Sequence, residues 1–489
     1  MKNELEKALE IVDQEIKKSG LSRRDAFKLA GLGGAAFLTG GATQAEAATA
    51  VRASDAKGKI VIVGGGLAGI STAARLANTL SNPDITVIEP NPKSVSYQPG
   101  TTLVASGVYE SKDELLYDTQ DFLPKGVTWI KNKAVDFNPE ANKLTLSSGE
   151  TVVYDFLIVA AGITLDYGAV KGLEEIGDAY SAGDASKIIK LFGDSGITSV
   201  YNIDSAEHMW KQTQKFIQSA KDGNKLNAVF TSPSTAIKCG GAPKKVMYLL
   251  NSRLDEAKAR ANVSMNYYDD SGKLFGVKEY ADAIEKQFIV RDMKWNFNHN
   301  LTAVDIAKKV AIFDKHWEEE GEYDKDLEEH EIIKKHLNVE VPFDFLHITP
   351  PQKAPDEIGK SEIGSGKGWV PVNKETLQHV KYSNIFAIGD IAAVPLGKTG
   401  GTVRKQYKVL VDNLISVMEG KELTAKFEGY TVCPLITDIG KVMLAEFDWT
   451  AKPTPSFPLD PTQERYIWWL LKVYLLKPMT QYGMLSGKA

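Results

Sequence analysis

The stretch Lys59–Glu89, KIVIVGGGLAGISTAARLANTLSNPDITVIE, decides the fold of this chain. It opens with an apolar, β-branched run at residues 60–63, which has the length and composition of a strand buried on both faces. A glycine-rich turn follows, then an Ala- and Leu-rich segment at 70–80 that predicts a helix, and then a second apolar strand at 85–88. This order predicts a parallel βαβ unit of a Rossmann-type domain.

The three glycines of the turn, Gly64, Gly66 and Gly69, have the spacing G-x-G-x-x-G. Gly64 suits a tight turn, Gly66 lets the backbone approach a diphosphate, and Gly69 lets helix and strand pack closely. The start of the helix offers unpaired N–H groups and a partial positive charge to that diphosphate. Glu89, at the end of the second strand, can accept hydrogen bonds from ribose hydroxyls. Because strands, helix and acid all agree with the glycines, dinucleotide binding is preferred over an ordinary βαβ turn.

The composition limits the classes of protein to consider. A chain of 489 residues, 43% hydrophobic and 25% charged, is long enough for two or three globular domains. Its net charge of −5 gives no reason to expect a nucleic-acid partner. Two cysteines cannot form a disulfide framework, and the seven histidines show no metal-ligand spacing, so no metal site is expected.

The N-terminal segment has the three-part order of an export signal. Arg23 and Arg24 are adjacent, an apolar stretch diluted with Gly and Ala follows at 29–41, and Ala45–Ala47 forms a small-x-small cleavage pattern. This order predicts a twin-arginine signal peptide over residues 1–47. An amphipathic helix with incidental arginines is the alternative.

Later segments indicate that the dinucleotide is FAD. One apolar strand ends in Ala-Ala-Gly at Gly162, and a second ends in Gly389 and Asp390, before a helical stretch at 402–418. In two-domain flavoproteins the Asp of such a strand meets the ribityl or phosphate end of FAD. The separated pair therefore predicts an FAD domain that is split by an insertion. Gln98 precedes a Pro-Gly turn that either lines the cofactor or lies at the surface.

The inserted portion lacks a second nucleotide-binding loop. A strand is expected at 227–231, but prolines and Cys239 follow it where a nicotinamide nucleotide would need bare glycine backbone. The electron donor is therefore not expected to be NAD(P)H. A charge-rich stretch at 317–335 is interpreted as a solvated surface excursion.

The two cysteines lie in different local settings. Cys239 is in a Gly/Pro loop between lysines, at the expected start of a helix at 243–250, and both features stabilise a thiolate. Cys433 is followed directly by Pro434. From these residues alone three interpretations stay open: inert buried thiols, a structural disulfide in an exported protein, or cysteines that face a flavin and carry sulfur.

The segments around both cysteines resemble those of sulfide:quinone oxidoreductases of the two-cysteine kind. The first is AIKCGGAPKKVMYL at 236–249, and the second is YTVCPLIT at 430–437 with VMLAEFD at 442–448. The resemblance extends from Lys59 to the C-terminus, and the third cysteine of some family members has no counterpart here. Shorter similar segments are SYQP at 96–99, HITPP at 347–351 and the run from Gly389-Asp390 to KTG at 398–400.

This resemblance implies an FAD-dependent enzyme of the pyridine nucleotide-disulfide oxidoreductase superfamily, whose partners are sulfide and a membrane quinone. Sulfide would be oxidised to sulfur or polysulfide through Cys239 and Cys433, and its electrons would pass through FAD to the quinone. We assign Cys433 as the cysteine whose sulfur meets the flavin and Cys239 as its partner. Lys398 matches a family lysine near the flavin and quinone, where its charge can stabilise a reduced anion; a surface lysine is the equal alternative.

The C-terminal stretch 464–478 is rich in Trp, Tyr and Leu, is interrupted by lysines and ends at Pro478. It is too short to cross a bilayer, and its composition predicts a helix lying on a membrane surface. The alternative is a helix packed on the protein's own core or in a dimer interface. With the export signal, this predicts a peripheral protein in the periplasm or on the outer face of the plasma membrane.

The predicted fold is α/β, with two Rossmann-like domains and a C-terminal amphipathic, membrane-associating helical segment. Two other functions compete: the flavoprotein subunit of flavocytochrome c sulfide dehydrogenase, and a non-catalytic, membrane-associated FAD-binding protein. A homo-oligomer is left open. The expected parts are a signal peptide at 1–47, an FAD-binding domain at 57–190 and 346–425, a second Rossmann-like domain with Cys239 at 191–345, and a C-terminal region with Cys433 at 426–489.

Overall fold

The structure, a computed structural model, describes residues 53–95, 97–324, 328–365 and 368–488. The predicted signal peptide therefore lies outside the described residues. The chain forms two compact units, and the expected domain boundary at 190 lies inside the second of them. Of the described residues, unit 1 comprises those up to 100, those at 113–164 and those from 353 onward, and unit 2 comprises those at 101–112 and 165–352.

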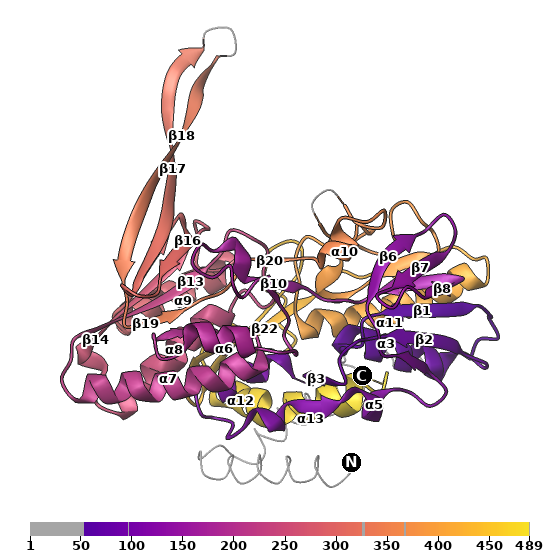
Figure 1. Cartoon of the computed structure of the whole chain (residues 1–489), viewed down its shortest axis with the longest axis horizontal. Helices are drawn as coiled ribbons and strands as arrows, with labels where there is room; N and C mark the ends of the chain where they lie inside the picture. The colour runs from indigo at the N-terminus through magenta and orange to yellow at the C-terminus, as the bar shows by residue number, and fades with distance from the viewer. Residues whose placement is uncertain (1–52, 96, 325–327, 366–367, 489) are drawn as a thin grey trace. The chain divides into compact units, whose positions relative to one another are not determined.

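Unit 1 is centred on a five-stranded parallel sheet (Figure 1). Its middle strand, β1 (Lys59–Val63), is apolar on both faces, as the sequence predicts. Ile60 and Ile62 enter one core cluster, whereas Val61 enters the other, because successive side chains of a strand point to opposite faces. The order across the sheet is β21 (Ile385–Ala387), β9 (Phe156–Val159), β1, β2 (Asp84–Ile88) and β5 (Thr128–Ile130).

Two helices cover one face of this sheet. The helix α3 (Leu67–Thr79) follows β1, and α11 (Gly400–Met418) packs against α3 in the same hydrophobic cluster. The α11 helix begins where the Thr399 hydroxyl accepts a hydrogen bond from the Thr402 N–H at 3.2 Å, which is an ordinary N-cap. The other face is covered by an antiparallel meander of β6 (Ala134–Asn138), β7 (Lys143–Leu146) and β8 (Thr151–Val153).

Unit 2 repeats this plan with a second five-stranded parallel sheet. Three long helices belong to it: α7 (Ile203–Lys221), α8 (Ala242–Glu256) and α9 (Lys278–Val290). The prediction of two Rossmann-like domains is therefore confirmed. The sheet order is β12 (Ile197–Thr198), β19 (Phe345–His347), β13 (Leu226–Ser232), β14 (Val263–Asp269) and β15 (Met293–Phe297).

Unit 2 also has an antiparallel meander, but two of its strands are very long. After β16 (His299–Asp305), β17 (Val310–Asp324) and β18 (Glu329–Pro342) pair as a hairpin that projects from unit 2 in Figure 1. Most of β18 is exposed. The described residues of the charge-rich stretch at 317–335 are thus mostly solvated, as predicted, but they lie mainly in extended strands rather than in a loop.

The C-terminal part of unit 1 contains the hairpin of β22 (Thr431–Asp438) and β23 (Lys441–Phe447) and a final helical segment. That segment runs through α12 (Tyr466–Leu470), a π-helical turn at 471–475, α13 (Leu476–Met479) and a second π-helical turn at 480–484. None of the helices in the described residues is long and apolar enough to cross a membrane.

The remaining elements are short connections. They are β3 (Lys93–Val95), α4 (Thr101–Val104), β4 (Leu116–Asp118), α5 (Thr119–Phe122), β10 (Thr164–Asp166), β11 (Asp178–Ala179), α6 (Ser186–Phe192), β20 (Gln352–Lys353) and α10 (Asp356–Gly359).

Candidate functional site

The loop between β1 and α3 has the geometry that the three glycines predict. Gly64 has a φ of +109°, which disfavours other residues, and a Cβ there would lie 2.4 Å from the carbonyl oxygen of Ala160. A Cβ at Gly69 would lie 1.9 Å from the carbonyl oxygen of Gly64, so only glycine allows helix and strand to pack this closely. A Cβ at Gly66 would meet no described atom within 4 Å. Open space therefore lies beside the backbone at the middle glycine.

This open space fits the diphosphate of a dinucleotide. Gly66 caps α3 without a side-chain hydrogen bond, and the first turn of α3 contains no acidic residue. The helix start can therefore donate backbone N–H groups to an anion and favour its charge. The chemistry of the donors, the small residues and the space beside them all suit FAD.

Glu89 lies at the end of β2, against the same loop. Its Oε2 accepts a hydrogen bond from the Gly65 N–H at 2.8 Å, and its Oε1 accepts one from the Asn91 N–H at 2.8 Å. Burial raises the pKa of the Glu89 carboxyl, and these two hydrogen bonds oppose that rise. A carboxylate held in this way is oriented by the backbone and keeps further lone pairs for ligand hydroxyls.

Two other predicted segments meet this loop. The Gly64 turn packs on Ala160 and Ala161, the residues that lead to Gly162, which itself has a φ of +69°. A Cβ at Gly389 would lie 3.1 Å from the Cβ of Ala68 in the first turn of α3. The structure therefore brings the ends of β9 and β21 to the start of α3, at the carboxyl edge of the parallel sheet, where such folds bind ligands.

Cys433 is connected to this edge through α11. It lies on β22, opposite Ala445 of β23, and only 4% of its surface is exposed. A Cβ at Gly401, in the first turn of α11, would lie 2.1 Å from Cγ1 of Val432, so the absence of a side chain at Gly401 lets β22 approach. The Thr402 hydroxyl donates to the hydroxyl of Thr431 at 3.4 Å. The cysteine strand thus starts against the N-terminus of α11.

Lys398 lies just before α11 and is not an ordinary surface lysine. Its Nζ donates to the backbone carbonyl of Asp390, and it lies 3.8 Å from the ring centroid of Trp369. Burial lowers the pKa of Lys398 to about 8, and the nearby Asp390 carboxylate opposes this shift. The ammonium therefore joins the Gly-Asp turn to the start of α11, and its pKa of about 8 lies well below that of an exposed lysine.

Gln98 begins the short turn Gln98–Gly100 and is half-buried. The Tyr97 hydroxyl donates to the backbone carbonyl of Lys472 at 3.1 Å, so this turn is fixed to the C-terminal segment. Gln98 thus lies in a half-buried turn, and its position beside the cofactor stays a prediction.

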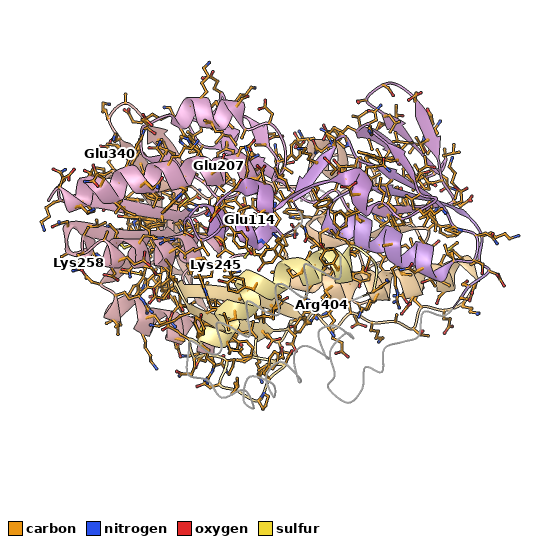
Figure 2. The ribbon with its side chains drawn as sticks, turned by 90° about the horizontal axis from the view of Figure 1, so that it is seen from below. Glu114, Glu207, Lys245, Lys258, Glu340 and Arg404 are labelled. Carbon is orange, nitrogen blue, oxygen red and sulfur yellow. The ribbon has the colours of Figure 1, made fainter. Side chains whose placement is uncertain are left out.

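Cys239 lies in unit 2, in the loop between β13 and α8. It has a φ of +52°, a conformation that costs a non-glycine residue about 1–2 kcal/mol. Its carbonyl oxygen accepts a hydrogen bond from the Ala242 N–H at 2.7 Å, which turns the chain into α8. Lys245, labelled in Figure 2, donates from Nζ to the Cys239 sulfur at 3.1 Å. Strained backbone of this kind persists where the surroundings fix it, and it is concentrated at functional sites.

Some residues of the site could not be found from sequence. Gln352 accepts a hydrogen bond at Oε1 from the Lys238 N–H at 2.7 Å and so holds the loop beside Cys239 from 114 positions away. Trp369 lies beneath Lys398, although its sequence neighbours show no pattern that marks it. The only available signal for the lysines near Cys239 was their position in the loop.

The C-terminal segment differs from its expectation. Trp468 and Trp469 are buried, and Trp468 packs on Phe457 with ring centroids 4.8 Å apart. These two side chains therefore pack inside the protein, as in the alternative of a helix on the protein's own core, and membrane association of the segment stays a prediction. Half-buried apolar residues remain on the same segment, among them Ile467, Leu471 and Leu475.

Comparison with known proteins gives a consistent family. A family model described as pyridine nucleotide-disulphide oxidoreductase matches residues 58–200. The chain is 36% identical over 429 residues to mitochondrial sulfide:quinone oxidoreductase of Mus musculus, covering 88% of this chain and 86% of that protein. The mitochondrial protein of the same name from Dictyostelium discoideum is 36% identical over 432 residues, with 88% and 86% covered.

Among solved structures, the sulfide:quinone oxidoreductase of the bacterium Aquifex aeolicus matches with a TM-score of 0.67 at 20% identity. The match covers 88% of this chain and 92% of that chain, and it shows a shared fold.

The predicted location is corrected by these relatives. Mitochondrial sulfide:quinone oxidoreductases are not periplasmic proteins exported by the twin-arginine route. The prediction of twin-arginine export to the periplasm or to the outer face of the plasma membrane is therefore wrong. It relied on residues 1–47, a short motif in a segment outside the described residues.

Proposed function

This chain belongs to the sulfide:quinone oxidoreductase family, and from its residues we propose how the two units divide that reaction. It is an FAD-dependent oxidoreductase that acts on sulfide and quinone. The reaction balances as hydrosulfide, quinone and one proton giving zero-valent sulfur and quinol, with two electrons leaving the sulfur. Bound FAD supplies the group that accepts these two electrons and passes them to the quinone.

We propose that unit 1 binds FAD along the carboxyl edge of its sheet. The N–H groups at the start of α3, beside Gly66, would hold the diphosphate, and Glu89 would accept from the ribose hydroxyls. Gly162 and Gly389 would let the backbone approach the cofactor, and Asp390 would meet its ribityl or phosphate end. Gln98 would line the same site. The open space at Gly66 and the absence of an acid in the first turn of α3 support this assignment.

We propose Cys433 as the cysteine whose sulfur meets the flavin. The observation that carries this assignment is the packing of β22 on the first turn of α11, where Val432 fits against Gly401. The start of α11 is the part of such folds that faces the isoalloxazine ring. Burial of Cys433 would exclude water from its sulfur, which protects a reactive persulfide from hydrolysis and side reactions.

We propose Cys239 as the cysteine that exchanges sulfur with sulfide. It is half-buried rather than buried, it lies at the start of α8, and its sulfur contacts an ammonium group. Each of these features favours a thiolate, which is the nucleophilic form in sulfur exchange.

We propose that Lys398 stabilises negative charge on the reduced cofactor or on the quinol as it forms. Its partly desolvated ammonium would interact more strongly with a developing anion than an exposed lysine would. Because its neighbours fix it through two backbone carbonyls, at Asp390 and Ala392, little reorganisation is needed.

We also propose peripheral attachment to a membrane through the C-terminal segment. Quinones reside in the bilayer, and a stripe of half-buried apolar residues, Ile467, Leu471 and Leu475, recurs once per turn of the segment. Changing Leu471 and Leu475 to Ser should reduce co-flotation with phospholipid vesicles while FAD content stays constant.

The test of the function is anaerobic absorbance of the flavin in the purified holoprotein. Sulfide should bleach the flavin, and a soluble quinone analogue should restore it. The Cys433→Ser variant should keep its FAD but lose bleaching by sulfide. Recovery with cytochrome c but not with quinone would contradict the proposed acceptor, and bleaching that persists in Cys433→Ser would contradict the assigned role of that cysteine.

A further inference from the structure

Two consecutive lysines in the first turn of α8 are almost completely buried. Lys244 is 3% exposed and Lys245 is 1% exposed. An ammonium group without water is costly unless an anion accompanies it, and the start of a helix disfavours cations further. Each of these lysines therefore requires a negatively charged or strongly accepting neighbour.

Lys244 has such a neighbour in unit 2. Its Nζ lies 3.7 Å from Oδ2 of Asp269 on β14 and donates to the hydroxyl of Tyr267 at 2.8 Å. The Tyr267 hydroxyl in turn donates to the same Asp269 oxygen at 2.9 Å. This closed network explains Lys244 as a structural ion pair.

Lys245 contacts the Cys239 sulfur. The distance from Nζ to Sγ is 3.1 Å, which is short for a neutral thiol because that sulfur is a weak acceptor. The loop that presents the sulfur is held at both ends, by Gln352 at Lys238 and by the hydrogen bond from Ala242. The loop therefore holds the sulfur in contact with the ammonium, and the contact is not incidental.

We propose that Lys245 is a positioning residue that holds the Cys239 sulfur as an anion during sulfur exchange. The proposal rests on the proposed role of Cys239. When hydrosulfide attacks the sulfur to which Cys239 is bonded in the oxidised enzyme, a new S–S bond forms and the bond to Cys239 breaks. The proton stays on the incoming sulfur, and the electron pair leaves on the Cys239 sulfur, where the ammonium meets it. Lys245 would thus improve the leaving group and store the thiolate for the next cycle.

The other lysines near Cys239 make different contacts among the described residues. Lys238, in the loop itself, donates to the Ser181 hydroxyl, and Lys244 on α8 is neutralised by Asp269 on β14. His347 on β19 is buried, and its lowered pKa keeps it neutral. A substitution at position 245 should therefore change the pKa of the Cys239 thiol more than a substitution at any of these positions.

The test measures the thiol directly, without sulfide or quinone. The chain has two cysteines, so the FAD-loaded Cys433→Ser protein keeps Cys239 as its single thiol. The rate of its alkylation by iodoacetamide is measured at several pH values between 5 and 10, with intact-protein mass spectrometry as the readout. The pH dependence of this rate should give an apparent thiol pKa well below the ordinary value of about 8.5. Adding Lys245→Met should raise that pKa by at least about one unit and slow alkylation at pH values below the new pKa, and Lys245→Arg should restore most of the lowered pKa.

Lys244→Met is the matched control, because it removes an equally buried ammonium from the same helical turn. It should leave the thiol pKa within about 0.3 units while lowering stability. A parent thiol pKa at or above about 8.5, or an unchanged profile in a folded Lys245→Met protein, would overturn the proposal. If Lys245→Met does not fold, the Cys239 pKa of the Cys433→Ser protein still supports or overturns the proposal. A lowered Cys239 pKa, together with a wild-type holoprotein whose flavin sulfide does not reduce, would instead refute the proposed function alone.

Discussion

The two parallel sheets of this protein carry the same strand, loop and helix at their centres, with different chemistry in the loop. In unit 1, β1 leads into α3 through Gly64 to Gly66, and in unit 2, β13 leads into α8 through a loop with Cys239. Both helices begin at a glycine without a side-chain cap and without an acid in the first turn. The first loop offers backbone and empty space, whereas the second offers a strained thiol and buried lysines.

This difference shows how one topology is used for two ligand chemistries. A helix start attracts an anion in both units, but only bare glycine backbone lets a bulky diphosphate approach. Where side chains fill the same position, we propose that the favoured anion is one that the protein itself carries, the sulfur of Cys239. The absence of a second glycine loop in the sequence thus fits the proposal that this loop presents a cysteine and does not bind a nucleotide.

The largest expected effect comes from filling the open space in only one of the two loops. Gly66→Val should fold, because its Cβ meets no described atom, but it should weaken FAD binding at least about 100-fold by blocking the diphosphate. Gly240→Val is the matched control, because a Cβ at Gly240 also meets no described atom within 4 Å. Flavin content and reconstitution titrations would compare them. Equal FAD loss in both variants would remove the functional distinction between the loops.

The half-buried Lys398 of unit 1 should give a pH dependence of its own. Because burial lowers the pKa of Lys398 to about 8, its ammonium is present below that pH and is lost above it. Quinone-dependent turnover should therefore decline above pH 8, by up to about tenfold per pH unit. Lys398→Arg should shift the decline upward because Arg stays charged, and Lys398→Met should be slow at all pH values. An inflection near pH 8 that survives in Lys398→Arg would exclude this lysine as its source.

The second strand of each sheet, next to the central strand, differs between the units in a way that affects stability. β9 of unit 1 ends in buried aliphatic residues, whereas β19 of unit 2 ends in His347, which is fully buried. Neither ring nitrogen of His347 has a hydrogen-bond partner in the part of the chain that the structure describes. Desolvation lowers the pKa of His347 to about 3, so as the pH falls below about 6.5 the unfolded chain binds a proton that the folded chain does not.

Stability from the neutral His347 is therefore complete above pH 6.5 and is lost as the pH falls toward 3. Between pH 6.5 and 5 the wild type should lose about 2 kcal/mol that His347→Phe retains. Urea unfolding of both proteins at the two pH values gives this difference directly. A His347→Phe variant with the same pH dependence as the wild type would mean that the ring is protonated in the folded protein.

Sequence patterns predicted the centres of both sheets but not what surrounds them. Glycine spacing and β-branched runs identified β1, α3, β2 and β13, because local backbone requirements are recorded in local residues. The contacts of Gln352 with the Cys239 loop and of Trp369 with Lys398 depend on chain segments that meet only in the fold. The burial of Trp468 was missed for the same reason, since a Trp-rich helix has one composition whether it faces lipid or protein.

The strain at Cys239 should be measurable as a small stability difference. Cys239→Ala and Cys239→Gly both remove the sulfur from Lys245, so comparing them isolates the backbone, whose φ is +52°. We expect Cys239→Gly to be more stable by about 1 kcal/mol, because glycine adopts this conformation without a Cβ clash. Gly240→Ala is the control, and it should be neutral or slightly stabilising because Gly240 has no positive φ. Equal stability of the two Cys239 variants would show that the loop relaxes.

The smallest effect is expected where the two units differ most in shape. The meander strands β7 and β8 of unit 1 have four and three residues, whereas β17 and β18 of unit 2 have 15 and 14. Beyond Lys315 and Leu337 the long hairpin exposes most of its side chains, including Tyr323 and Ile332. A two-stranded ribbon of this kind gains little from burial, because it has only one neighbouring strand and no covering layer.

Replacing residues 316–336 by an Asn-Gly turn should therefore change the stability of the holoprotein by no more than about 0.5 kcal/mol. The Tm of the FAD-loaded protein is the measurement. Phe313→Ala, at the fully buried base of the same hairpin, is the contrasting variant and should cost about 3–5 kcal/mol. If removing the tip lowered the Tm as much as Phe313→Ala, the ribbon would be packed against something in solution. Its exposed apolar residues would then be part of an interface, and the long hairpin would have a role in binding a partner.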